Sequence, residues 1–245
     1  HPIAVTSLSS SITYPDWVQE LPQITVSMNS LDIESIIAME PDLVIVGSYQ
    51  KETYGQQLAD AGIAVYYTSE GPSIAYNETK EEAITLARSF GGDALAEEIT
   101  AEFAAVEARA ASYCENHTSQ RMMIFFHTPG TYQQTSQGYL GSMLSLLPFE
   151  NLSDTIIDPA SRTATIDVET AVVLNPEVIF AISPTAPSAE MLQAIYEEAF
   201  AQNAELWNQI DAITNEYVTS KGIHIINSLN ALIDLLEARY PANNQ

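Results

Sequence analysis

The sequence predicts an α/β fold made of two Rossmann-like lobes with parallel sheets, joined by one long α-helix. Three observations predict it: a segment that occurs twice, the apolar pattern inside that segment, and a long stretch without helix breakers between the copies. The 245 residues leave room for two lobes with a core each. We expect an N-terminal lobe over residues 1–92, a connecting helix over 93–116 and a C-terminal lobe over 117–245.

The repeated segment covers residues 31–46 and returns in degenerate form at residues 166–181, an offset of 135 positions (166 − 31). Three pairs are identical in type: Asp32 and Asp167, Glu34 and Glu169, and Pro41 and Pro176. In each copy an acidic N-cap leads into a helix with apolar residues at helical spacing, and a proline ends that helix. The continuous apolar run that follows is typical of a strand buried on both faces. Two such copies predict two α/β lobes of related construction.

The other elements follow from breakers and periodicity. In the first lobe we expect strands over 2–5, 23–26 and 63–67, and helices over 54–61 and 77–89, the second ending at Gly91 and Gly92. Residues 93–116 are rich in Ala and Glu, which predicts a connecting helix roughly 36 Å long at about 1.5 Å per residue. In the second lobe we expect strands over 121–126 and 217–226, a loop over 151–161, and helices over 140–147, 190–200, 204–214 and 231–240.

The composition excludes several classes of function. Eight Lys and Arg stand against 32 Asp and Glu, a formal net charge of −24 that repels phosphate backbones and anionic lipids. We therefore expect no nucleic-acid partner, and we interpret most of the acidic residues as a solubilising surface of the kind that is adapted to salt. Cys114 is the only cysteine, so no intramolecular disulfide can form. No apolar run reaches the length of a membrane span.

Signatures of catalysis are missing. The chain has no glycine-rich phosphate loop, no His-x-x-x-His pair and no cysteine cluster. The segment Ser136–Gly138 lacks the preceding glycine of a nucleophile elbow, because position 134 is Gln. The four histidines share no chelating spacing: His1, His117, His127 and His224. We expect no enzyme.

Aromatic and polar residues gather near the predicted carboxyl ends of strands in both lobes, where open α/β sheets bind ligands. The candidates are Tyr14, Trp17, Met28, Tyr49 and Lys51 in the first lobe and His127, Tyr132 and Tyr139 in the second. Facing each other across a cleft, they suit a large, flat, partly apolar ligand, with aromatic faces for stacking and His, Met or Tyr heteroatoms for an iron centre. The alternative is that single tyrosines and Met28 fill the core edge of their own lobe; for His224, inside a predicted strand, burial is favoured.

Glu34 and Glu169 occupy equivalent positions in the two copies. Acidic residues are favoured in the first turn of a helix by its dipole, which accounts for them without any further function. Two like charges in symmetric positions can equally engage a two-fold symmetric partner. Both interpretations stay open at this point.

The repeat, the connecting helix and the loop motif Pro129-Gly-Thr-Tyr132, Gly138-Tyr-Leu-Gly-Ser142 and Glu150-Asn151 resemble the class III substrate-binding proteins of ABC importers for vitamin B12, siderophores and haem. The resemblance covers nearly the whole chain. It implies an extracytoplasmic receptor, periplasmic or a cell-surface lipoprotein, that meets the membrane only through a lipid anchor or the permease. It also implies that Glu34 and Glu169 dock on the permease dimer, and that a haem or ferric chelate is cargo rather than an intrinsic cofactor.

Within this family, Met28-Asn29 and the stretch 196–215 resemble the haem-receptor lipoproteins of Gram-positive bacteria. The resemblance implies that Met28 is an iron ligand if the cargo is haem. Those receptors carry a histidine iron ligand after the second repeat, where this chain has Ser183-Pro-Thr-Ala-Pro187; the hypothesis is that His127 replaces it. The cations expected near the cleft are few, Lys51, Arg162 and Lys221, which favours haem or a corrinoid over an anionic siderophore. The alternative from another class is a tetrapyrrole-metal enzyme of chelatase-like architecture.

Overall fold

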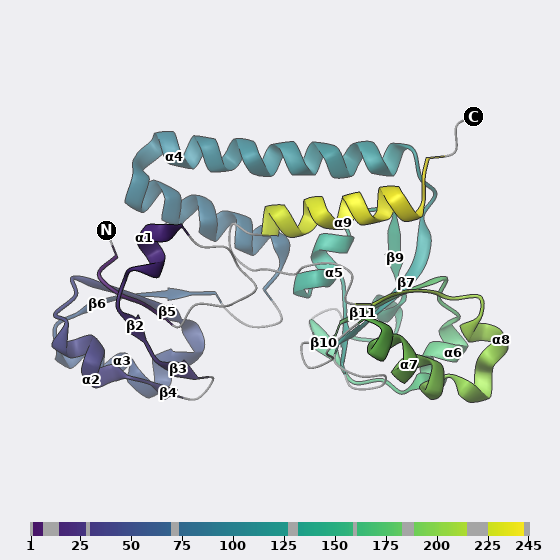
Figure 1. Cartoon of the computed structure of the whole chain (residues 1–245), viewed down its shortest axis with the longest axis horizontal. Coiled ribbons are helices and arrows are strands. Elements are labelled where there is room, and N and C mark those ends of the chain that lie inside the picture. The colour runs from purple at the N-terminus through teal and green to yellow at the C-terminus, as the bar shows by residue number, and fades with distance from the viewer. Residues whose placement is uncertain are drawn as a thin grey trace. The chain divides into compact units, whose positions relative to one another are not determined.

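The computed structural model of this chain describes residues 2–6, 15–27, 30–69, 74–126, 132–158, 161–182, 189–214 and 225–242. The chain divides into two compact units, unit 1 (residues 1–70) and unit 2 (residues 71–245). Both contain parallel strands, and unit 2 contains a helix of 40 residues (Figure 1). The predicted α/β class with parallel sheets and one long helix is therefore confirmed.

Unit 1 is built from short elements around one small core. In chain order they are β1 (Val5–Thr6), α1 (Asp16–Gln19), β2 (Gln23–Ile24), β3 (Val26–Ser27), β4 (Ser30–Leu31), α2 (Ile33–Ala38), β5 (Leu43–Gly47), the 3₁₀ turn η1 (Ser48–Gln50), α3 (Lys51–Asp60) and β6 (Ala64–Thr68). Strands β5 and β6 pair in parallel across five residue positions, with α3 as the crossover. Leu58 and Ile36, from the two longer helices, are buried beneath this pair.

Unit 2 contains a larger sheet and longer helices. In chain order its elements are α4 (Tyr76–Glu115), β7 (Gln120–Phe126), β8 (Tyr132–Gln134), α5 (Tyr139–Leu144), β9 (Phe149–Asn151), η2 (Leu152–Thr155), β10 (Thr163–Ala164), α6 (Val168–Leu174), β11 (Val178–Ile182), α7 (Ala189–Ala199), η3 (Ala201–Asn203), α8 (Ala204–Trp207), β12 (Asp211–Thr214) and α9 (Ile225–Arg239). The strand order is β10-β8-β7-β11-β12, and β9 pairs with β7. Strands β9, β7, β11 and β12 are parallel, and β8 is antiparallel to β7.

The repeated segment folds alike in both units, because α2 and α6, and likewise β5 and β11, begin 135 positions apart. The carboxylates of Asp32 and Asp167 each accept a hydrogen bond from the backbone N–H three residues later, at 3.1 and 2.8 Å. Each such bond satisfies a donor that the first helical turn leaves unpaired. After each helix, the residue preceding the proline is left-handed: Glu40 (φ 48°) and Asn175 (φ 52°). The duplication is thus a structural repeat down to its caps.

The sheet of unit 2 is covered on both faces. Side chains of β7 and β11 alternate between two cores: Met122, Ile124 and Phe180 belong to one, with α4, α5 and α9, whereas Met123, Phe125 and Ile179 belong to the other, with α6, α7 and α8. All six are fully buried. The continuous apolar runs of β7 and β11 therefore reflect burial on both faces, as predicted for this copy of the repeat.

For β5 that prediction is wrong. Leu43 and Ile45 are 38% and 48% exposed, while Val44 and Val46 pack against the core that contains α2 and α3. Within unit 1 the two helices cover only one face of the β5–β6 pair. An apolar run alone does not reveal whether a second layer of helices is present.

Helix α4 breaks at Gly92, whose φ of 77° and ψ of −173° are not helical, so residues 76–91 and 93–115 form two arms, as the two glycines predicted. Both arms belong to unit 2. Tyr76 of the first arm contacts Phe103 of the second edge-to-face, and the Tyr76 N–H donates to the Ser142 hydroxyl at 2.7 Å. The two units therefore divide near residue 70, and not at the lobe boundaries expected at 92 and 116, because the first arm of α4 packs on the second.

The motif Gly138–Ser142 has a structural role in this packing. A Cβ atom at Gly141 would lie 1.9 Å from the Thr135 carbonyl oxygen, so only glycine fits beside that backbone. Ser142, one residue later, accepts the hydrogen bond from Tyr76. The motif therefore joins the start of α4 to the strand region before α5.

Two predicted elements are wrong in the C-terminal part. Residues 204–214 were expected to form one helix, but α8 ends at Trp207, and Asp211–Thr214 form β12, parallel to β11. Sheet pairing here overrides local helix propensity. Ile225 and Ile226 were expected in a strand, but they begin α9 and are buried in the core. The rest of that expected strand, 217–224, lies outside the described residues.

Candidate functional site

Three of the expected ligand contacts, Tyr14, Met28 and His127, lie outside the described residues, as does the segment 183–188 that follows β11. Tyr132 begins β8. The two described aromatic candidates of unit 1 are accessible: Trp17 of α1 is 51% exposed and Tyr49 of η1 is 53% exposed. Tyr49 directly follows the carboxyl end of β5, which is the position where parallel sheets bind ligands.

Lys51 begins α3 and is oriented by an aromatic ring. Its ammonium nitrogen lies 5.4 Å from the centroid of the Tyr67 ring in β6, within the range of a cation–π interaction. The side chain is thereby held at the carboxyl edge of the β5–β6 pair. In unit 1 Lys51 is the only Lys or Arg residue of the sequence.

Tyr139 takes an interior position. It is only 6% exposed, it belongs to the core with α4 and α9, and burial raises the pKa of its phenol even though Ser228 offers a hydrogen bond that opposes the rise. Its burial favours a packing role. Tyr139 is therefore left out of the proposed ligand contacts below.

The described cations are all engaged. Lys221 lies outside the described residues, and Lys51 faces Tyr67. The other six form ion pairs with carboxylates: Lys80 with Glu107, Arg88 with Asp93, Arg109 with Asp234 and Glu237, Arg121 with Glu177, Arg162 with Glu78, and Arg239 with Asp211. Among the described residues, an anionic ligand thus meets no cation that is not already held by a carboxylate or an aromatic ring.

Arg162, one of the cations expected near the ligand, shows what this engagement means. Its guanidinium donates two hydrogen bonds to the carboxylate of Glu78, at 2.6 and 2.7 Å. These bonds lower the pKa of Glu78, and the same carboxylate also accepts from the Ala75 N–H at the start of α4. A ligand that recruited Arg162 would have to displace a bidentate partner that also caps a helix.

The acidic ends of the two repeat copies are presented to solvent. Glu34 and Glu169 are exposed in the first turns of α2 and α6. Asp32 and Asp167 are occupied as caps: hydrogen bonds from the side chain and the backbone of Ser35 lower the pKa of Asp32, and those from Thr170 lower the pKa of Asp167. At the start of each copy, Glu34 and Glu169 are therefore the exposed carboxylates that do not serve as caps.

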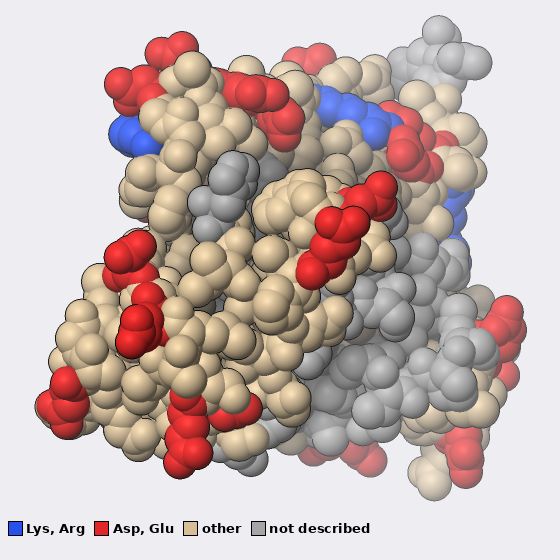
Figure 2. Space-filling model, turned by 60° about the vertical axis from the view of Figure 1, so that its left-hand side comes forward, with Lys and Arg blue, Asp and Glu red and all other residues tan. Residues whose placement is uncertain are grey.

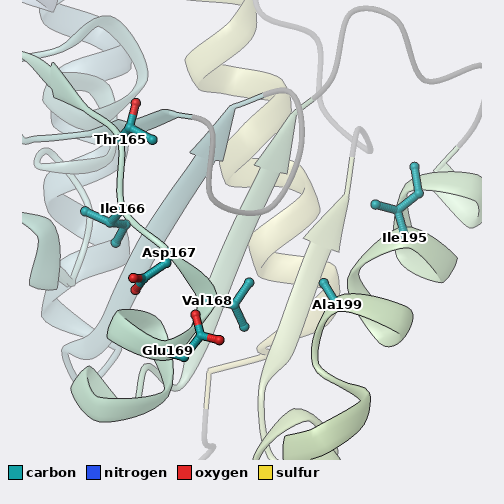
Figure 3. A pocket seen from close by; sticks show the side chains of 7 residues that line it. All are labelled: Thr165, Ile166, Asp167, Val168, Glu169, Ile195 and Ala199. Atoms are coloured by element: carbon teal, nitrogen blue, oxygen red, sulfur yellow. The ribbon is translucent and has the colours of Figure 1, made fainter.

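A hollow of about 630 Å³ lies beside Glu169 in unit 2. Figure 3 shows residues 165–169, leading into α6, on one side and Ile195 and Ala199 of α7 on the other. Its lining is mixed: Ile166, Val168, Ile195 and Ala199 are apolar, whereas Thr165, Asp167 and Glu169 are polar. The hollow belongs to the acidic end of the repeat, not to the carboxyl ends of the strands where the ligand is expected.

Sequence reasoning missed three residues. Glu78 had no assigned role, yet it binds Arg162; the signal was its place as the third residue of a helix, where a carboxylate can cap the backbone. Ile195 and Ala199 lie in the expected helix over 190–200, and their i, i+4 spacing puts them on one face of it. Nothing in the sequence shows that this face lies opposite Glu169.

Among the described residues, no group of three or more His, Cys, Asp or Glu side chains is placed to hold a metal ion. None of the described helices combines the length and apolar character that crossing a membrane requires.

The sequence and the fold are similar to those of known binding proteins. A cobalamin-binding protein of Halobacterium salinarum is 24% identical over 194 residues, which are 79% of this chain and 51% of that protein. The chain thus spans about half the length of the curated relatives it matches.

Two solved structures share the fold. An ABC transporter substrate-binding protein of Listeria monocytogenes has a TM-score of 0.75 at 17% identity, covering 95% of this chain and 90% of that one. IsdE of Staphylococcus aureus, solved with haem, has a TM-score of 0.70 at 17% identity and the same coverage. The family whose model matches the chain is one of binding proteins rather than enzymes, in agreement with the expected lack of a catalytic role. The model of the periplasmic binding protein family matches residues 5–220, which are most of the 245 residues, so this chain belongs to that family.

Proposed function

We propose that this protein is the extracytoplasmic solute receptor of an ABC importer, that it captures a metal tetrapyrrole, and that it delivers it to the permease. The observation that carries the receptor role is the family match over residues 5–220, supported by a repeat that is duplicated down to its caps. Attachment to the membrane through a lipid anchor belongs to the same proposal.

The charge of the described residues bears on the choice of ligand. Anionic siderophores and the two propionates of haem are normally met by cationic side chains. Here six described cations are paired with carboxylates and Lys51 faces Tyr67, while unit 1 carries nine Asp and Glu against that single lysine. Placing further negative charge in such surroundings costs free energy. We therefore propose a ligand without net negative charge.

A corrinoid meets this requirement, because the positive charge of cobalt in the corrin ring offsets its phosphate and its side-chain amides are uncharged. The relatives from Halobacterium salinarum are named cobalamin-binding proteins, which supports the same ligand. Haem is the second candidate: it is supported by the likeness of Met28 and its surroundings to haem receptors and by the shared fold with haem-bound IsdE. A ferric siderophore ranks third for lack of available cations.

Trp17 and Tyr49 are the described residues that we assign to ligand contact. Each exposes about half of a large aromatic side chain, and Tyr49 lies at the carboxyl end of β5. Aromatic faces stack on flat macrocycles with little loss of side-chain entropy. Met28, His127 and Tyr132 complete the proposed set from the sequence, with Met28 and His127 as iron ligands if the cargo is haem.

Glu34 and Glu169 are proposed to dock on the two subunits of the permease. They are exposed, occupy the same helical position in both repeat copies, and are not consumed by capping, which Asp32 and Asp167 perform. Carboxylates presented in this way are suited to arginine or lysine side chains of a two-fold symmetric partner.

The ligand is tested by calorimetric titration of the purified protein with cyanocobalamin, haemin and a ferric hydroxamate. We expect saturable binding of cyanocobalamin, and about tenfold weaker binding in Trp17→Ala and in Tyr49→Ala, because each removes a stacking face. Phe90→Ala is the matched control: Phe90 is a 62% exposed aromatic beside the break in α4, away from any strand end, and its loss should leave affinity unchanged.

Other outcomes separate the alternatives. A Soret shift with haemin, lost in Met28→Ala and His127→Ala, together with no response to cyanocobalamin, replaces the corrinoid by haem. Binding of the hydroxamate alone contradicts the argument from charge. A folded protein that binds none of the three overturns the tetrapyrrole proposal.

A further inference from the structure

His117 lies where the end of α4 meets the end of α9. The helix α4 ends at Glu115, and the imidazole follows two residues later. Its Nδ1 atom lies 2.7 Å from the carbonyl oxygen of Tyr113, one turn back in α4. Its Nε2 atom lies 2.8 Å from the carbonyl oxygen of Tyr240, which follows α9. One ring thus bridges two segments that are more than a hundred residues apart in the sequence.

Both neighbours of the ring are acceptors. A backbone carbonyl oxygen carries lone pairs and no proton, so it can only accept a hydrogen bond. A neutral imidazole has one N–H and one bare nitrogen, and can donate to only one of the two oxygens. The bare nitrogen would then face the second oxygen at hydrogen-bonding distance, lone pair against lone pair. Only the doubly protonated imidazolium satisfies both contacts.

Three further features favour a positive ring at this place. The imidazole is stacked on the Tyr113 ring, with centroids 3.8 Å apart and planes 12° from parallel, an arrangement that attracts a cation to the aromatic face. The ring lies at the carboxyl end of a long helical arm, where the helix dipole stabilises positive charge. Burial and, after it, the negative charge of Glu237 in α9 together raise the pKa of Tyr113 to about 12, so a carboxylate lies near this cluster.

We propose that His117 in its imidazolium form is a proton-dependent clasp that fastens the end of α9 to the end of α4. The charged groups on the elements that meet at the clasp are Arg109 and Glu115 of α4, Glu237 and Arg239 of α9, and Asp211 of β12. Arg109 donates to Glu237 at 2.8 Å, and Asp211 accepts from the Tyr240 hydroxyl at 2.5 Å. Cys114 precedes the cluster and donates to the Leu146 carbonyl rather than to the ring.

The stabilisation that the clasp provides depends on pH. Its stabilisation is present when the ring carries two protons and is lost as rising pH removes one of them. The neighbouring bonds from Arg239 and Tyr240 to Asp211 behave in the opposite sense, because acid protonates their acceptor. The attachment of α9 is therefore weakened in acid, by protonation of Asp211, and in alkali, by loss of the histidine proton.

The protonation state is tested directly on the folded protein by long-range proton–nitrogen correlation of the imidazole groups at about pH 7. The His117 signal is assigned by its disappearance in His117→Gln. We expect two protonated ring nitrogens for His117. One protonated and one pyridine-like nitrogen overturns the proposal, and this measurement on the wild-type protein stands even if the variant does not fold.

The clasp itself is tested by amide hydrogen exchange of α9 at about pH 5.5 and about pH 8.5, on either side of the range in which imidazole ordinarily titrates. In the wild type we expect the backbone amides of residues 234–239 to exchange about tenfold faster from local opening at the higher pH, after correction for intrinsic exchange. In His117→Gln the corrected rates should be fast at both values. Equal corrected rates at both pH values in the wild type contradict the clasp.

Discussion

Asp211 shows how one residue sets the acid limit of stability. Burial by itself would raise the pKa of this carboxyl, but hydrogen bonds from Arg239 and Tyr240 outweigh it and hold the pKa below the ordinary value of 3.8. A group with a depressed folded pKa stabilises the protein above its unfolded pKa, and this contribution is lost as pH falls through the folded value. Unit 2 should therefore lose stability below about pH 4.

The prediction concerns Asp211→Asn. At neutral pH the variant should lose about 2 kcal/mol of unfolding free energy, because the guanidinium of Arg239 is left without its carboxylate in a half-buried place. Its stability should also depend less on pH below about 4 than that of the wild type. Urea denaturation between about pH 3 and about pH 7 measures both effects.

Asp42→Asn is the matched control, because Asp42 is exposed and makes no hydrogen bond or ion pair within the described residues. Equal acid sensitivity of the two variants would contradict the assignment of this limit to Asp211.

At the residue scale the sequence was informative where a side chain acts locally. Asp32 and Asp167 were recognised as caps because capping depends only on the residues of the first turn. Tyr139 and Arg162 were placed near the ligand, but the structure buries the first and pairs the second with Glu78, 84 positions away. Such partners depend on the fold, and no local pattern encodes them.

At the scale of elements the two repeat copies offer a reciprocal test. Glu40 and Asn175 hold the same left-handed position after α2 and α6. Asparagine adopts this conformation more readily than a longer side chain does, so the first copy carries the less suitable residue. Glu40→Asn should raise the unfolding free energy by about 0.5 kcal/mol, and Asn175→Glu should lower it by about the same amount.

Thermal or urea unfolding of both variants measures this pair, and the double swap controls for net charge because its composition equals that of the wild type. Effects of the same sign in the two single variants would show that left-handed preference is not what distinguishes the copies.

Elements that are marked by local sequence signals were predicted better than elements that depend on contacts with distant residues. Helices α3, α7 and both arms of α4 were predicted close to their bounds, because breakers and helical spacing mark them in the sequence. Strand β12 was missed, because only pairing with β11 makes residues 211–214 a strand. The exposed face of β5 was missed for a related reason: its apolar run resembles that of β11, but helices cover one face instead of two.

For the whole molecule the charge is the dominant physical property. Of 32 acidic residues, seven belong to the ion pairs of the described residues, so most of the negative charge is not neutralised by direct contact. Acidic side chains (red) clearly outnumber basic ones (blue) on the face shown in Figure 2. Their mutual repulsion opposes the compact state, and dissolved salt screens it.

We therefore expect the protein to be stabilised by salt. Its thermal midpoint should rise by several degrees, on the order of 5 °C, between about 0.1 M and about 2 M KCl. Replacing three exposed glutamates of α4 that have no ion-pair partner, Glu97, Glu98 and Glu102, by glutamine should reduce this rise. Scanning calorimetry measures both, and a midpoint that falls with KCl would mean that the ion pairs outweigh the repulsion.

The way α9 completes the core of unit 2 has a consequence for biosynthesis. Leu229, Leu232, Ile233 and Leu236 of this helix are fully buried beside α4 and the sheet, and Arg109 of α4 bonds to Asn230, Asp234 and Glu237. These side chains are made only after the whole sheet of unit 2 has been translated. Unit 1 can thus fold during translation, whereas the nascent unit 2 leaves part of its apolar core exposed until α9 emerges from the ribosome. In that interval the apolar side chains that α9 will cover are exposed to water, which makes the incomplete unit prone to aggregate.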